Sequence, residues 1–255
     1  PKTVRYEVGL WQELGKKTSL EVNLYYRDIY DLLSLATVST YNQVEYVIYT
    51  NKDYGNVRGL ELKMDYGINN LFIQTNYTYQ FTRGNADNPA QTFNRQGASI
   101  DEVIRFIPMS WDQRHTFNLS AGYNTQKFGI SATGYYNSGT PYTFSPQGES
   151  NLALLNLYPN NDYKPSNYHA DLSAYINLPK IFGFSPKIDL LVYNLTDRYN
   201  EYGVSSETGR AYSAVVNETE LLSHRSNFNN YEDRYKDPSS FSAPRQIKVG
   251  LTVQF

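Results

Sequence analysis

The chain has 255 residues, which is enough for one large β-domain or two small ones. Its formal net charge of -2 gives no strong attraction to nucleic acid, and its lack of cysteine excludes thiolate metal sites, cysteine nucleophiles and disulfide bonds. Aromatic residues make up 15% of the chain, and 25 residues are Tyr, whose ring and hydroxyl suit a boundary between water and hydrocarbon.

The hydropathy of the chain excludes a bundle of transmembrane helices. Its mean hydropathy is -0.58, and no apolar run approaches the roughly 18 residues that a spanning helix needs. A transmembrane β-barrel meets no such objection, because its strands alternate lipid-facing apolar with lumen-facing polar residues. The chain begins at Pro1 without the basic and apolar segments of a signal peptide. We therefore expect that a leader was removed or that the beginning of the protein is missing.

Apolar and polar residues alternate with period two along most of the chain, and this pattern predicts about nine strands. In chain order they cover residues 4–10, 20–26, 60–66, 71–79, 116–123, 128–136, 170–178, 188–192 and 247–255. Many of them span about 10 residues, the length that crosses a bilayer at a tilt. The pattern predicts an all-β, antiparallel, up-and-down transmembrane barrel.

The predicted connections alternate between short and long. The short ones lie at 15–17, 67–70, 124–127 and 179–185, and the long polar ones at 34–43, 82–111, 143–166 and 203–243. Barrels of the bacterial outer membrane have this arrangement, with tight periplasmic turns and long extracellular loops. A soluble β-sandwich has no reason to place all its long loops at one end.

The polar positions of the strands predict a wide lumen. Glu61, Lys63 and Asp65 alternate with the apolar residues of segment 60–66. Charges on one face are expected where a water-filled or plugged interior lies behind the wall. The alternative interpretation is the solvated face of an open sheet.

The last residues predict a signal for barrel assembly. Lys248, Gly250, Val253 and the terminal Phe255 resemble the C-terminal β-signal of outer-membrane proteins, in which a polar residue, a glycine and two late hydrophobic positions precede a terminal aromatic. This resemblance implies the barrel-assembly machinery as a partner. A free amphipathic strand can pair with such a machinery by adding to its sheet.

Four short segments of the sequence resemble the C-terminal barrel half of TonB-dependent receptors and transporters, and they occur in that family's order. They are residues 54–61, 135–143, 193–199 and 244–247. The resemblance implies a barrel of twenty-two strands around an N-terminal plug, with residues 1–255 forming the C-terminal portion from strand fourteen onward. It also implies coupling to the TonB–ExbB–ExbD complex through a plug and TonB box that are expected to lie outside this chain.

Residues for catalysis or cofactor binding are sparse. Asp112 precedes His115, and Asp171 follows His169, so Asp/His pairs of an outer-membrane hydrolase are one interpretation. The other is that polar residues at strand ends meet loops and water. The third histidine, His224, has no partner at metal-ligand spacing, and no phosphate-binding loop or basic run is present. We predict no enzyme, no metal, no cofactor and no nucleic-acid partner.

The long loops hold aromatic and Arg residues that are typical of binding surfaces. The candidate ligand-binding residues are Arg105, Trp111, Tyr142, Tyr158, Tyr163, Arg210, Arg225, Tyr231 and Arg234. Tyrosines within the strands instead predict aromatic girdles at the two membrane interfaces, namely Tyr26, Tyr66, Tyr77, Tyr123 and Tyr136.

The combined prediction is a multi-pass receptor of the bacterial outer membrane. It contacts outer-membrane lipid, binds a scarce extracellular solute with its loops and imports that solute with TonB-coupled energy, with room for a surface lipoprotein over the loops. One alternative is a ten-stranded barrel protease or lipase, which requires one more strand and a working Asp/His pair. Another is a surface β-sandwich that binds glycans through its tyrosines.

Overall fold

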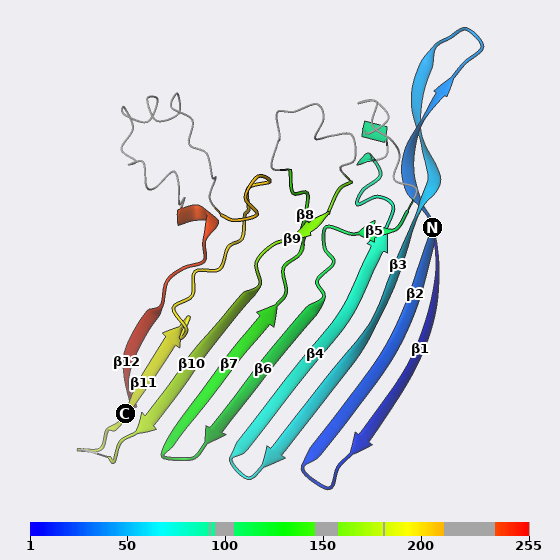
Figure 1. Ribbon diagram of the computed structural model, residues 1–255. Helices are drawn as coiled ribbons and strands as arrows, with labels where there is room; N and C mark the ends of the chain where they lie inside the picture. Colours follow the sequence, from blue (N-terminus) through cyan, green and yellow to red (C-terminus); the bar gives the residue numbers. More distant parts are fainter. Residues whose placement is uncertain (92, 95–104, 146–157, 181, 212–237, 255) are drawn as a thin grey trace, which may run out of the picture.

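The structure is a computed structural model that describes residues 1–91, 93–94, 105–145, 158–180, 182–211 and 238–254. Within these ranges no helix has the length and apolar character needed to cross a membrane. The main sheet follows the chain, because each long strand pairs antiparallel with the next (Figure 1). Its path is β1 (Lys2–Glu13), β2 (Thr18–Ser39), β3 (Glu45–Ile68), β4 (Leu71–Gly84), β6 (His115–Asn124), β7 (Phe128–Asn137), β10 (Asn167–Asn177), β11 (Ser185–Tyr193) and β12 (Gln246–Gln254).

The nine strands of this path confirm the nine strands predicted from alternation. Three shorter strands lie in the connections: β5 (Ile107–Pro108) pairs with β4, and β8 (Pro141–Tyr142) pairs with β9 (Asp162–Tyr163). Among the residues that the structure describes, a 3-10 turn, η3, spans Pro238–Ser240. The result is an open all-β sheet with β1 and β12 at its two edges.

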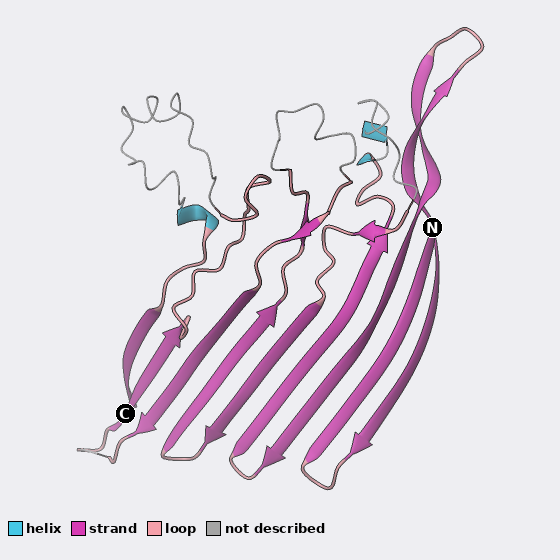
Figure 2. Cartoon of the chain, viewed as in Figure 1, coloured by secondary structure: helices cyan, strands magenta, loops and turns pink. Residues whose placement is uncertain are grey.

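The connection predicted as a long loop at 34–43 is wrong. Strands β2 and β3 continue there as a paired ribbon, with Ser39 opposite Glu45, and the ribbon projects beyond the other connections (Figure 2). β-Branched and aromatic residues in both strands favour extended backbone. The turn is closed by Thr40, whose backbone amide donates to the Val44 carbonyl at 2.9 Å and whose hydroxyl accepts from the Val44 amide at 3.1 Å.

The two ends of the strands carry different connections. Tight turns join the strands at one end, which we call the turn end, and the longer connections lie at the opposite, loop end (Figure 1). Gly15 and Asn69 occupy the turns after β1 and β3 with φ of 73° and 49°. Gly and Asn are the residues that adopt this left-handed region most readily.

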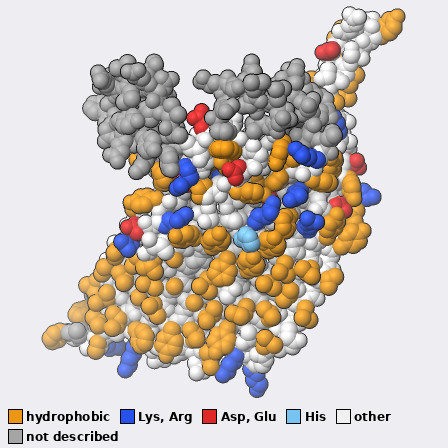
Figure 3. All heavy atoms as spheres, in the orientation of Figure 1, with side chains coloured by type: hydrophobic (Ala, Val, Ile, Leu, Met, Phe, Trp, Pro, Cys, Tyr) orange, Lys and Arg blue, Asp and Glu red, His pale blue; other side chains and the backbone are white. Residues whose placement is uncertain are grey.

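Side chains of the two sheet faces differ as the alternation predicts. One face, the outer face, is apolar and exposed: Val8 and Val249 expose 74% and 72% of their surface. Figure 3 shows a broad band of hydrophobic side chains across this face, bordered by Lys and Arg near the turn end and near the loop end. The opposite, lumen face carries Glu21 and Lys63, which form an ion pair at 3.4 Å. An apolar belt this large is expected where hydrocarbon covers it.

Candidate functional site

The loop end is held by a buried carboxylate. Asp112 is fully buried and accepts hydrogen bonds from the Thr82 amide at 2.6 Å, from Arg114 Nε at 2.8 Å and from the Tyr163 hydroxyl at 3.2 Å. Burial acts to lower the pKa of the Arg114 guanidinium, but Asp112 outweighs burial and raises it. Burial, with Asp112 beside it, raises the pKa of the Tyr163 hydroxyl. This cluster therefore ties the end of β4 to the start of β6 and to β9.

A second connection lies beside it. The Asn160 amide donates to Asp87 Oδ2 at 2.8 Å and to the Pro108 carbonyl at 3.0 Å, while Asp87 Oδ1 accepts from the Ser110 amide at 2.8 Å. Asn160 is only 5% exposed, so its polar atoms require these partners. Two separate connections, the one between β4 and β6 and the one between β7 and β10, thus meet at one point of the loop end.

Two asparagine side chains at the loop end form the hydrogen bonds that a neighbouring strand would otherwise form with the backbone. The Asn200 amide pairs with both backbone groups of Tyr168, accepting from the amide at 3.1 Å and donating to the carbonyl at 2.8 Å. Asn161 does the same to Phe144, at 2.7 and 3.0 Å. A side-chain amide offers the same donor and acceptor as a peptide group. Tyr168 lies in β10 beyond the part paired with β11, and Phe144 lies in a connection, so in both cases an Asn side chain replaces a missing backbone partner.

The connection after β11 is organised by Glu201, which is 8% exposed. Its carboxylate accepts from Arg210 Nη2 at 2.6 Å, from Arg210 Nε at 3.0 Å and from the Ala211 amide at 2.7 Å. Burial acts to raise the pKa of the Glu201 carboxyl, but these donors outweigh burial and hold the pKa below its ordinary value. Such a paired, two-nitrogen contact fixes the orientation of both side chains.

The structure places six of the nine candidate ligand-binding residues at the loop end. Arg105 is exposed and stacks on Tyr158, with its guanidinium carbon 4.6 Å from the ring centre. Trp111 is 53% exposed. By contrast, Tyr163 and Arg210 are engaged in the internal clusters described above. Tyr142 donates to Asp162 at 3.3 Å. Arg225, Tyr231 and Arg234 lie outside the described residues, and a binding role for the whole set stays a prediction.

An apolar cavity of about 350 Å³ opens beside Trp111, where the β2–β3 ribbon leaves the sheet. Its apolar lining includes Leu32, Leu33, Met109 and Trp111. This volume lies within the range of small-molecule sites. Met109 was not identified from the sequence, because an isolated residue in a loop carries no periodic signal. Asp112 was singled out only as a possible partner of His115, and its bonds to Thr82, Arg114 and Tyr163 were not predicted.

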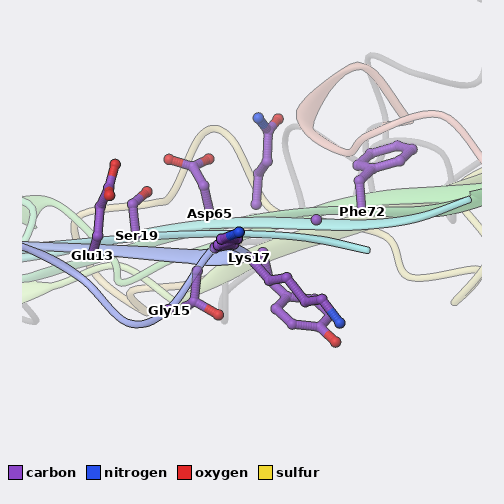
Figure 4. Close-up of a pocket in the computed structure, with 11 residues that line it drawn as sticks. Glu13, Gly15, Lys17, Ser19, Asp65 and Phe72 are labelled. Atoms are coloured by element: carbon purple, nitrogen blue, oxygen red, sulfur yellow. The ribbon is translucent and has the colours of Figure 1, made fainter. Parts of the chain in front are cut away.

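A second hollow of about 410 Å³ lies at the turn end. Figure 4 shows the side chains of Glu13, Ser19, Asp65 and Phe72 on the same side of the sheet there. Asp65 and Ser19 are directly opposite each other on β3 and β2. The turn end of the lumen face is therefore polar and acidic as well as hollowed.

The two histidines that the structure describes lie on opposite faces of the sheet. His115 contacts the Tyr77 hydroxyl through Nδ1 at 2.8 Å and stacks on Tyr79 on the outer face. His169 meets Asp171 at 2.7 Å, on the face that carries Tyr135, which is the lumen face. Asp112 binds Arg114, and His224 lies outside the described residues. In the described part of the chain no group of His, Asp and Glu could hold a metal ion.

The predicted assembly signal lies in edge strand β12. Lys248 Nζ lies over the Tyr193 ring on the lumen face, 5.0 Å from its centre, and Gly250 is opposite Asp189. Val253 pairs with Pro186 at the turn end, and Phe255 is not among the described residues. The assembly role of these residues stays a prediction.

Comparisons with known proteins agree with this architecture. A family model described as TonB dependent receptor-like, beta-barrel matches residues 2–195. A search of curated proteins finds no match. Among solved structures, the ferric-catecholate import receptor Fiu from E. coli K12 matches with 17% identity and a TM-score of 0.55, covering 98% of this chain and 27% of that one.

Two further solved structures show the same fold. The outer membrane transporter YddB from Escherichia coli has 13% identity and a TM-score of 0.54, with 78% of this chain and 29% of that chain covered. The ferripyoverdine receptor of Pseudomonas aeruginosa, bound to ferripyoverdine, has 10% identity and a TM-score of 0.54, with 98% and 26% covered. The chain thus spans between a quarter and a third of the length of these receptors.

Proposed function

Because this chain belongs to the TonB-dependent receptor-like β-barrel family, we propose that it is the C-terminal part of the wall of a receptor that imports a scarce extracellular solute with TonB-coupled energy. The chain is a multi-pass protein of the bacterial outer membrane. Its family is one of receptors and transporters, which agrees with the prediction that it is not an enzyme. The hydrolase and β-sandwich alternatives are therefore set aside.

The observation that carries this proposal is the different chemistry of the two strand ends. The loop end combines exposed Arg and aromatic groups with clusters that hold the connections in place. The turn end has tight turns and an acidic hollow on the lumen face. Solute capture needs binding side chains that are held in fixed positions on the extracellular side of the barrel. A gated interior needs polar groups that face a plug.

We further propose that the solute is an anionic ferric chelate with aromatic groups. Arg105 stacked on Tyr158 offers a cation on an aromatic plane, and Trp111 borders an apolar cavity. Guanidinium groups bind anionic oxygens, while aromatic planes stack on ligand rings. Two of the structurally similar receptors are named for ferric chelates, which makes this class the first to test.

Energy coupling in this proposal depends on parts outside the described wall. An N-terminal plug would rest against the lumen face and connect through its TonB box to TonB, ExbB and ExbD. Lumen-facing ions such as Lys63 and Glu21 would face that plug. The barrel-assembly machinery would act on β12, and a surface lipoprotein would be accommodated at the loop end. These partners belong to the proposal.

Uptake of radioactive iron tests this function. The full-length receptor is expressed in an iron-starved Gram-negative strain that lacks its own chelate receptors, and ⁵⁵Fe is supplied as a ferric catecholate. We expect saturable uptake that disappears when tonB is deleted. Trp111→Ala should raise the half-saturating concentration about tenfold, whereas Trp11→Ala, at the other tryptophan, should leave it unchanged.

Each result separates one element of the proposal. Uptake that survives tonB deletion would exclude the energy coupling. Lack of uptake of ferric catecholate, with uptake of another solute, would exclude the chelate while keeping the transporter. Equal uptake by the two Trp variants would remove Trp111 and its cavity from the binding site.

A further inference from the structure

Two guanidinium groups meet at one aromatic ring of the outer face, and one of them, that of Arg58, has no part in the transport proposal. Arg58 in β3 is directly opposite Phe81 in β4, and both alternate onto the outer face with Tyr26. The guanidinium carbon of Arg58 lies 5.4 Å from the centre of the Phe81 ring, and that of Arg114 lies 4.3 Å from it. One aromatic ring therefore carries two cations on the face that contacts lipid.

The position of this cluster along the strands matches the outer membrane interface. Arg58 precedes Tyr66 by eight residues in β3. At about 3.3 Å per residue and a strand tilt of roughly 40°, this places Arg58 about 20 Å above Tyr66 along the membrane normal. The apolar band of such barrels is about 25 Å tall, so Arg58 lies where acyl chains give way to headgroups. Figure 3 agrees, with Lys and Arg at the loop-end border of the apolar band.

The charges of the cluster are only partly compensated within the described chain. Arg114 is paired with Asp112. Arg58 has no carboxylate within ion-pair distance among the described residues, and Asp28, an acidic residue on the outer face of β2, accepts from Asn56 at 2.8 Å. Arg83, two residues after Phe81 on the same face, has a buried Nε without a hydrogen-bond partner. Arg114 also donates to the Tyr163 hydroxyl at 2.6 Å. Among the described residues, the guanidinium that remains without a hydrogen-bond partner beside the apolar groove is therefore that of Arg58.

Below Arg58 that groove is lined by apolar and aromatic side chains. A shallow hollow of about 430 Å³ includes Tyr6, Val8, Leu24, Leu60 and Tyr79, with Arg58 and Phe81 at its edge. An acyl chain fits an apolar hollow, and a planar guanidinium offers paired donors to phosphate oxygens. Because the hollow and the cations are continuous, one molecule with both features can occupy them together.

We propose that Arg58, Arg114 and Phe81 form a binding site for the phosphate of a lipid in the outer leaflet, whose acyl chain lies in the groove beside Tyr6 and Leu60. Arg58 donates to the phosphate, and Phe81 holds both guanidinium planes in position. The site rests on the outer-membrane placement of the barrel and not on the transported solute. It anchors the β2–β4 wall at the interface.

Native mass spectrometry of the full-length receptor in detergent tests this site. The probes are a phosphatidic acid, the diacylglycerol with the same acyl chains, and inorganic phosphate. We expect the receptor to retain phosphatidic acid, and Arg58→Gln to weaken binding about fivefold, the effect of one basic residue near a lipid surface. Arg27→Gln is the matched control, since Arg27 lies on the lumen face of the adjacent strand and its loss should change nothing.

The remaining outcomes decide against the site. Equal retention of diacylglycerol would show that the groove binds acyl chains without the phosphate. Binding of inorganic phosphate at the same concentration would show an anion site without a lipid. An equal loss of phosphatidic acid retention in Arg58→Gln and Arg27→Gln would show that Arg58 is not part of a specific lipid site. If Arg58→Gln fails to assemble, Arg58→Lys keeps the charge without the planar fork, and unchanged lipid retention in it would also contradict the proposal. Iron uptake is measured separately, so either proposal can fail alone.

Discussion

The two ends of the strands are held together in different ways. At the turn end each tight turn is closed by its own bonds: the Leu14 amide donates to the Thr18 carbonyl, and the Thr125 amide donates to the Phe128 carbonyl, both at 2.8 Å. Neighbouring turns are also joined side by side, as where the Asn177 side-chain amide donates to the Gln126 carbonyl at 2.7 Å. At the loop end, Asn160 reaches Asp87 across 73 positions, and Tyr163 reaches Asp112 across 51. Each turn is thus closed by neighbouring residues and lies against the adjacent strand end, whereas the loop end depends on contacts between separate long connections.

We call the nine-stranded sheet the wall and the connections at the loop end the rim. The difference between the two ends predicts that the wall and the rim can lose their structure independently of each other. The wall gains stability from a continuous ladder and from the apolar outer face in lipid. The rim gains it from a few buried polar clusters, each of which is costly to leave incomplete. A substitution at the rim should therefore release loops without opening the sheet, and a substitution on the outer face should do the reverse.

The largest effect is expected at Asp112. Asp112→Ala leaves Arg114 partly buried without its carboxylate and removes the acceptor of the Thr82 amide, a loss of about 3–5 kcal/mol to the local structure. In full-length receptor in outer membranes, we expect proteolytic cleavage of the connections at the loop end, while the barrel keeps its heat-dependent shift on electrophoresis. Asp162→Ala, at an exposed carboxylate, is the control. If Asp112→Ala also abolishes the heat-dependent shift, wall and rim fold as one unit.

The next largest effect is expected on the two faces of β7. Ala132 lies at the middle of β7 on the outer face, opposite Ala121 and Leu172, whereas Thr133 lies next to it on the lumen face. Ala132→Arg should destabilise the barrel by about 2–4 kcal/mol, because it places a charge in hydrocarbon. Thr133→Arg should cost much less, because its side chain enters the lumen. Urea unfolding in lipid vesicles measures both, and equal losses would contradict the assignment of the faces.

The sequence predicts the wall well because period-two alternation records which face is apolar. The structure explains one glycine of segment 54–61, which resembles the receptor family. A Cβ at Gly59 would lie 2.6 Å from the Tyr25 hydroxyl and from the Tyr79 carbonyl, so this position has no room for a side chain. Alternation fails at 34–43, where polar residues that resemble a loop are held as a ribbon by cross-strand pairing.

The rim is less predictable for a physical reason. Asp112, Glu201 and Asn200 have no periodic neighbours that would mark them, and their partners come from other connections. Composition identifies Arg and aromatic residues as binding groups, but it cannot separate Arg105, which is exposed, from Tyr163, which is engaged internally. Only the three-dimensional arrangement makes that distinction.

The smallest effect is a dependence of the rim on pH. The pKa of Glu201 is lowered in the folded protein from an ordinary value of 4.5. Its contribution to stability is therefore complete above that value and is lost as the pH falls below about 4.5 through the folded pKa. Since Arg210 is half exposed, this contribution is about 1 kcal/mol or less. Hydrogen exchange of residues 201–211 should accelerate on acidification, whereas Glu201→Gln should exchange fast at every pH. An acid response that persists in Glu201→Gln would assign the effect to another carboxylate and leave Glu201 with a packing role only.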